Sequence, residues 1–102
     1  MSEPHWIVHR LQRDKPEDFE FIFHCPGCGT GHGFKTDGPE PCWTFNGDMV
    51  KPTINPSLLL IRWGHGGEPP DVCHSFVRDG QIQFLNDCTH KLAGQTVPLE
   101  PL

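Results

Sequence analysis

Two cysteines separated by a proline and a glycine, in the run Cys25-Pro26-Gly27-Cys28, constrain the fold of this chain more than any other feature. Residues 19–24 before them alternate aromatic with polar side chains, which predicts a β-strand with one buried face. A strand that leads into such a turn is typical of a zinc knuckle, because Pro and Gly permit the tight turn in which backbone amides point at the two sulfurs. We therefore expect Cys25 and Cys28 to bind zinc.

The length of the chain makes such a metal clamp useful. With 102 residues, a single domain buries only about 60–70% of the surface that its unfolded chain exposes. Hydrophobic residues make up 35% of the sequence, and 11 Gly and 11 Pro interrupt it with turns, so the core is small. The sequence predicts one domain over residues 1–102: a small, mostly β, zinc-stabilised domain with a zinc-ribbon-like knuckle and β-hairpins.

A C-x2-C knuckle supplies two of the four ligands that a structural zinc ion takes, so two more must come from elsewhere. Four candidates gather downstream: Cys73, His74, Cys88 and His90. A knuckle followed by a distant group of thiols and imidazoles is typical of a closed site that joins distant chain segments. His32 is a further candidate, either as a ligand or as a residue that orients one. Cys42 lies in a loop and is expected to be a free thiol.

The clearest hairpin predicted by the sequence has Asp79-Gly80 as its two-residue turn. In that register Val77 faces Ile82 and Ser75 faces Phe84, so Cys73 lies on the apolar face. His74 then points to the opposite face. Because neighbouring residues of a regular strand cannot easily serve one site, one of these two candidate ligands is expected to have another role.

Further strands are expected on both sides of the knuckle and before the hairpin, from composition and turn signals. They cover residues 6–11, 30–35, 43–45 and 57–63. After the hairpin, Asn86 and Asp87 can cap a short helix near residues 87–93, which Gly94 would end. Asp87 has an alternative role as the carboxylate that orients a ligand histidine.

Charge and hydropathy argue against two classes of protein. A net charge of −5 with eight scattered basic residues argues against binding to nucleic-acid phosphates. The N-terminus lacks the pattern of a signal peptide, and the longest apolar run, residues 58–61, is far short of the roughly 20 residues that a membrane span needs. We therefore expect a protein of the host cytoplasm, where the five cysteines stay reduced.

Three motifs connect the sequence with a known family. These are CPGC, the run WTFNGD-x2-KPT from Trp43 and the run CHSFVRDG…DCTH…AGQTVPL from Cys73. In these three motifs the chain resembles small zinc-binding-type proteins of tailed phages and prophages. That family has no established function and often carries the label ammonia monooxygenase, which does not fit a thiol-rich chain without membrane spans. The resemblance implies that the metal-type positions are Cys25, Cys28, His32, Cys73, His74, Cys88 and His90.

No catalytic motif was recognised in the sequence, so the function predicted is a non-enzymatic one. We expect a phage or prophage accessory module that binds a host or phage protein, for example to modulate a defence system. One alternative is a zinc-dependent hydrolase or deaminase-like enzyme, with Asp48, Asp79 or Asp87 as the general base. A second alternative is a knuckle that binds nucleic acid or a nucleotide through exposed tryptophans.

Overall fold

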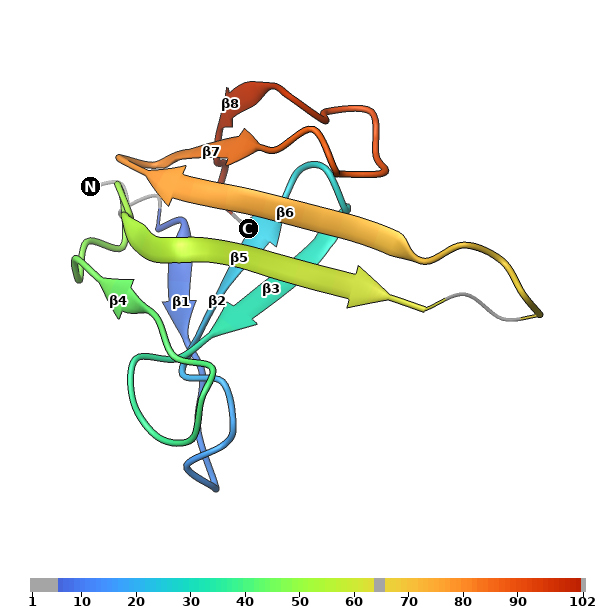
Figure 1. Cartoon of the computed structure of the whole chain (residues 1–102). Helices are drawn as coiled ribbons and strands as arrows, with labels where there is room; N and C mark the ends of the chain where they lie inside the picture. The colour runs from blue at the N-terminus through green and yellow to red at the C-terminus, as the bar shows by residue number, and fades with distance from the viewer. Residues whose placement is uncertain (1–5, 64–65, 102) are drawn as a thin grey trace.

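The computed structural model describes residues 6–63 and 66–101 and contains two antiparallel β-sheets (Figure 1). The first sheet has three strands, in the order β1-β2-β3. The second has five strands, in the order β4-β5-β6-β7-β8. The bounds are β1 Val8–Arg10, β2 Phe21–Cys25, β3 Thr30–Phe34, β4 Thr44–Phe45, β5 Ile54–Arg62, β6 Asp71–Arg78, β7 Gln81–Phe84 and β8 Thr96–Pro98. The predicted mostly β fold is confirmed.

The three-stranded sheet is built around the knuckle. In β2, Phe21, Phe23 and Cys25 are buried, while the residues between them are half-exposed, as the alternation of the sequence predicts. β2 and β3 form a ribbon in which Cys25 lies opposite Thr30. The knuckle turn therefore closes this ribbon and keeps Cys25 and Cys28 at one end of the sheet.

The β6–β7 hairpin confirms the register predicted from the sequence. Val77 lies opposite Ile82, and Ser75 lies opposite Phe84. Asp79 and Gly80 form the turn with φ angles of 51° and 78°, the left-handed values that a two-residue hairpin of this kind requires. Figure 1 shows that β5 and β6 form the longest pair of strands in the molecule.

β5 starts earlier than predicted and contains an irregularity. Ile54 lies opposite Val77 and Leu58 lies opposite Ser75, so residues 55–57 of β5 face Phe76 alone. This bulge interrupts the ladder at Pro56, which has no N–H to donate. Ser57 is the last residue of the bulge, immediately before regular pairing resumes.

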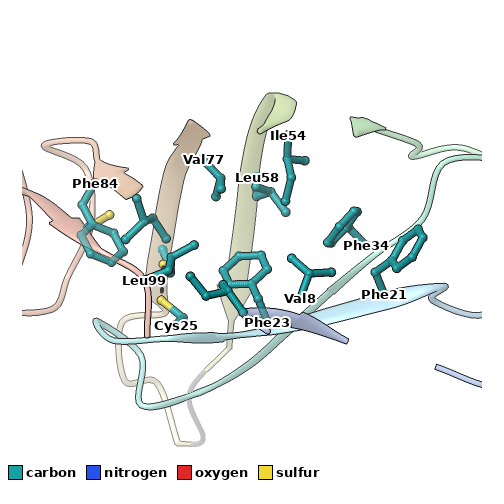
Figure 2. Packing of buried hydrophobic residues seen from close by; sticks show 14 residues of the cluster. Val8, Phe21, Phe23, Cys25, Phe34, Ile54, Leu58, Val77, Phe84 and Leu99 are labelled. Atoms are coloured by element: carbon teal, nitrogen blue, oxygen red, sulfur yellow. Dashed lines mark hydrogen bonds between the residues drawn. The ribbon is translucent and has the colours of Figure 1, made fainter. Parts of the chain in front are cut away.

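The core lies between the two sheets. Figure 2 shows Val8, Phe23 and Cys25 of the first sheet pointing toward Ile54, Leu58 and Val77 of the second. Their exposed fractions are at most 4%, so this layer supplies most of the hydrophobic stabilisation. The two sheets are thus held together by one apolar layer, with Cys25 at one end of it.

The predicted helix near residues 87–93 is wrong: this segment forms hydrogen-bonded turns. The amide of Cys88 donates to the carbonyl of Leu85, and the amide of Thr89 donates to the carbonyl of Val72 on β6. The segment therefore uses its backbone groups to bind along β6, which a helix could not do. In the described part of the chain, no helix is long and apolar enough to cross a membrane.

Candidate functional site

Two groups of chemically reactive side chains lie on opposite faces of the five-stranded sheet. They meet at β6, where Cys73 is buried on the inner face and His74 is half-buried on the outer face. The sequence predicted this division between neighbouring residues. The inner face of the sheet thus carries a cluster of metal-type ligands, and the outer face carries a hydrogen-bonded group around His74.

On the outer face, Ser57, His74 and Asp87 form a continuous hydrogen-bonded chain. The Oγ atom of Ser57 lies 2.9 Å from Nε2 of His74, and Nδ1 of His74 lies 3.0 Å from Oδ2 of Asp87. An ionised carboxylate only accepts hydrogen bonds, so Nδ1 carries the proton and Nε2 of the neutral ring accepts one from the serine hydroxyl. This is the order of groups in a Ser-His-Asp catalytic triad.

The bulge in β5 and a tryptophan position Ser57. Bulges often redirect a side chain beside an active site, and here the bulge ends at the serine. The indole Nε1 of Trp43 donates a hydrogen bond of 3.2 Å to the carbonyl oxygen of Ser57. The backbone of this residue is therefore held from the side that faces away from β6.

The sulfur of Cys88 positions the other two members. It accepts a hydrogen bond from the backbone N–H of His74 and donates one to the carbonyl of the same residue, each at 3.2 Å. The side chain of Cys88 thus takes the place of a neighbouring strand at this point of β6. Because Asp87 directly precedes Cys88, these bonds also set the carboxylate beside the imidazole.

On the inner face, four side chains form a group that fits a metal ion. The ligand atoms of Cys25, Cys28, His32 and Cys73 all lie within 4.8 Å of one another. Sγ of Cys25 is 3.8 Å from Sγ of Cys73, and Nε2 of His32 is 3.4 Å from Sγ of Cys28. A tetrahedral zinc site with Zn–S bonds of about 2.3 Å has ligands about 3.5–3.8 Å apart, so the spacing matches. The amide of Cys28 points at Sγ of Cys25, as in a knuckle.

The ionisation of these thiols also fits a cation. A hydrogen bond with Cys73 lowers the pKa of Cys25 to about 3, and burial raises the pKa of Cys28 to about 11. The bond with Cys25 raises the pKa of Cys73 far above its ordinary value. In the metal-free chain, burial therefore favours the protonated thiol of Cys28, and the hydrogen bond with Cys25 favours that of Cys73. A divalent cation held among the three sulfurs would stabilise the thiolates and let all three ionise.

A second group shares Cys73 and adds Cys88 and His90. Nε2 of His90 lies 3.6 Å from Sγ of Cys73, and the imidazole packs against Gly27 so closely that a Cβ there would come within 2.4 Å of it. The knuckle is therefore in contact with the C-terminal segment. A cavity of about 190 Å³ borders this side of the metal groups, lined partly by Gly27, Leu60 and His90, and is not lined by the triad.

The structure thus divides the residues that the sequence selected as metal ligands. Cys25, Cys28, His32 and Cys73 come together, and Cys88 and His90 lie beside them. His74 lies outside both groups, with Ser57 and Asp87 on its two ring nitrogens. Cys42 also lies outside them: its sulfur donates to the carbonyl of Gly38. Sequence reasoning missed Ser57 altogether, although the outward direction of His74 indicated that this histidine had a separate role.

A family model described as the bacterial ubiquitination-like system serine protease (BubE) matches residues 3–85. The chain belongs to this family. The match includes Ser57 and His74 and ends at residue 85, shortly before Asp87. Comparisons with curated proteins and with solved structures gave no match. The BubE family and the geometry of the outer face thus point independently to a serine nucleophile.

Membership of the BubE family corrects the function predicted from the sequence. The prediction of a non-enzymatic binding module is wrong, because the family is described as a serine protease. The zinc hydrolase alternative assigned the reaction to a metal-bound water, whereas the outer face presents a serine that is hydrogen-bonded to a histidine. The predicted phage origin and protein partner gain no support from the family.

Proposed function

We propose that this chain is a serine protease of a bacterial ubiquitination-like system and that it hydrolyses the bond that follows the C-terminal tail of a ubiquitin-like protein. The hydrogen-bonded chain Ser57–His74–Asp87 is the observation that carries the proposal. The description of the BubE family supports it, because it names a serine protease of a bacterial ubiquitination-like system, and a ubiquitin-like protein is the substrate that we propose for such a system.

Each member of the triad has a defined role in this mechanism. Ser57 attacks the carbonyl carbon of the scissile bond while Nε2 of His74 takes the hydroxyl proton. Asp87 keeps the imidazole in the tautomer that accepts this proton and stabilises the imidazolium that results. His74 then gives the proton to the leaving group, and a water molecule hydrolyses the acyl-enzyme by the same route.

We further infer that the metal ion is zinc, held by Cys25, Cys28, His32 and Cys73. Three thiolates and one imidazole in tetrahedral spacing favour zinc over harder cations. A site with four protein ligands is closed, and it lies on the face of the sheet opposite the triad, so the ion acts as a clamp. The cytoplasm suits this centre, because all five cysteines are free thiols.

Cleavage assays with triad variants test the proposal. The substrate is a ubiquitin-like protein of the same bacterial system, fused through its C-terminal tail to a reporter protein. We expect Ser57→Ala and His74→Ala to lower kcat at least about a thousandfold, and Asp87→Asn to lower it by about 10²–10⁴, because the residues act as a unit. Circular dichroism and zinc content should stay at the wild-type level. A Ser57→Ala enzyme that still cleaves the fusion would show that the nucleophile lies elsewhere.

A further inference from the structure

The second half of β5 has a free edge. β4 pairs only with Ile54 and Asn55, at the beginning of the strand. β6 covers the other side as far as Arg62. Among residues 6–63 and 66–101, no other strand pairs with residues 58–62. Figure 1 shows β5 continuing beyond β4 without a neighbour on that side.

The register shows which backbone groups point outward along this edge. His74 and Val72 direct their backbone groups away from β5, since the carbonyl of His74 accepts from Leu85 and that of Val72 accepts from Thr89. Their partners on β5 are Leu59 and Ile61. In antiparallel pairing, residues opposite each other direct their backbone groups the same way relative to the ladder, either both toward it or both away. The N–H and C=O groups of Leu59 and Ile61 therefore face the free edge, while those of Leu58 and Leu60 bond to β6.

The side chains along this edge are apolar and exposed. Leu59 is 53% exposed, Ile61 41% and Trp63 74%. Leu59 lies opposite His74, so its side chain is on the same face of the sheet as the triad. Proteins usually protect such an edge with Lys, Pro or a bulge. The bulge of β5 ends before Leu58, and residues 58–61 carry no charge.

We infer that an extended segment of the substrate adds as a strand to this edge, with its backbone bonded to Leu59 and Ile61. This inference rests on the proposed function and defines how the substrate binds. The edge begins beside Ser57, and at about 3.3 Å per residue Leu59 lies about 7 Å along the strand and Ile61 about 13 Å. A tail of a few extended residues thus spans from the edge to the nucleophile, and its apolar side chains contact Leu59 and Ile61.

Hydrogen exchange of single amides tests this binding mode. The protein is the full chain with Ser57→Ala, and the probe is a synthetic peptide with the tail sequence of the ubiquitin-like protein. At a peptide concentration about 100 times its Kd, we expect exchange of the Leu59 and Ile61 amides to slow about 100-fold. The amides of Leu58 and Leu60 are already paired to β6 and should change little. An alternating pattern of this kind is specific to strand addition.

A variant checks the result. Ile61→Pro removes one outward N–H and no bond to β6, so we expect peptide affinity to fall about five- to tenfold. The control is Val50→Ala, at an exposed apolar residue away from the edge, which should bind as the parent protein does. If Ile61→Pro does not fold, the exchange pattern of the Ser57→Ala chain decides alone.

The outcomes separate this inference from the proposed function. Peptide binding without slower exchange at Leu59 and Ile61, or no binding at all, would overturn strand addition even if the wild-type chain cleaves the fusion. Slower exchange without peptide, increasing with protein concentration, would show that a second copy of the chain occupies the edge. The alternating pattern in a chain whose wild type cleaves nothing would support the binding mode and refute the protease.

Discussion

At the scale of single residues, members of the triad and residues of the candidate metal groups are neighbours in the sequence. His74 follows Cys73, and Asp87 precedes Cys88. The strand β6 directs Cys73 and His74 to opposite faces, and Cys88, in the turns after β7, is bonded through its sulfur to the backbone of His74. The orientation of the imidazole relative to Asp87 therefore depends on the thiol of Cys88, which takes no part in the proposed reaction.

This arrangement makes the replacement of Cys88 informative. Cys88→Ala leaves the N–H of His74 without a partner, whereas the C=O keeps its bond from the amide of Leu85. An unsatisfied buried group costs about 1–3 kcal/mol. We expect kcat/KM to fall about tenfold or more as Asp87 loses its fixed position. Cys88→Ser should keep most of the activity, because a hydroxyl also accepts and donates. Steady-state cleavage of the fusion substrate measures both.

Metal content provides the control for the two Cys88 variants, since both should retain zinc if Cys88 is not a ligand. Wild-type kcat/KM in Cys88→Ala would contradict a positioning role. Equal losses of zinc in the alanine and serine variants would instead assign Cys88 to the metal site.

At the scale of elements, the sequence predicted those parts whose signal is local. The β6–β7 hairpin was predictable to the residue because Asp79-Gly80 determines both the turn and the register. The turns at residues 87–93 were mistaken for a helix because their backbone partners, Val72 and His74, are on a distant strand. Capping residues alone do not reveal that competition.

The contrast between local signals and contacts with distant segments also explains which residues of the site could be predicted. The knuckle is a local motif, and Cys25 and Cys28 were predicted directly from it. Asp87 was considered as the carboxylate that orients a ligand histidine, but the histidine that it contacts, His74, lies outside both metal groups. Ser57 had no local signature, because its role depends on a bulge that brings a serine hydroxyl within 2.9 Å of the imidazole of a histidine 17 residues away. Such a triad is recognised by geometry and not by spacing.

At the scale of the whole molecule, the metal group joins the two sheets. Cys25 and His32 belong to β2 and β3 of the first sheet, and Cys73 belongs to β6 of the second. A metal ion held by these residues would therefore link the two sheets at one end of the apolar core. Because β6 also carries His74, a metal clamp at Cys73 would stabilise the strand that supplies the histidine of the triad.

The stability of the protein should depend on this bridge. We expect His32→Ala to lose most of its zinc and, for a loss of about 2 kcal/mol or more, to melt at least about 8 °C lower. Cys42→Ser is the matched control, since its thiol lies outside both metal groups, and should melt like the wild type. Elemental analysis and thermal denaturation measure the two effects. Full zinc content in His32→Ala would assign the fourth ligand to another residue, with His90 the nearest candidate.

The most direct test of the central claim is covalent labelling with a fluorophosphonate, located by peptide mass spectrometry. The chain has only three serines, Ser2, Ser57 and Ser75, so a label is easily assigned. An activated serine displaces fluoride from the phosphorus and keeps the phosphonyl group. We predict labelling of Ser57 in the wild type and its loss in His74→Ala. An unlabelled Ser57, or one labelled equally in both proteins, would contradict a triad in which His74 activates Ser57.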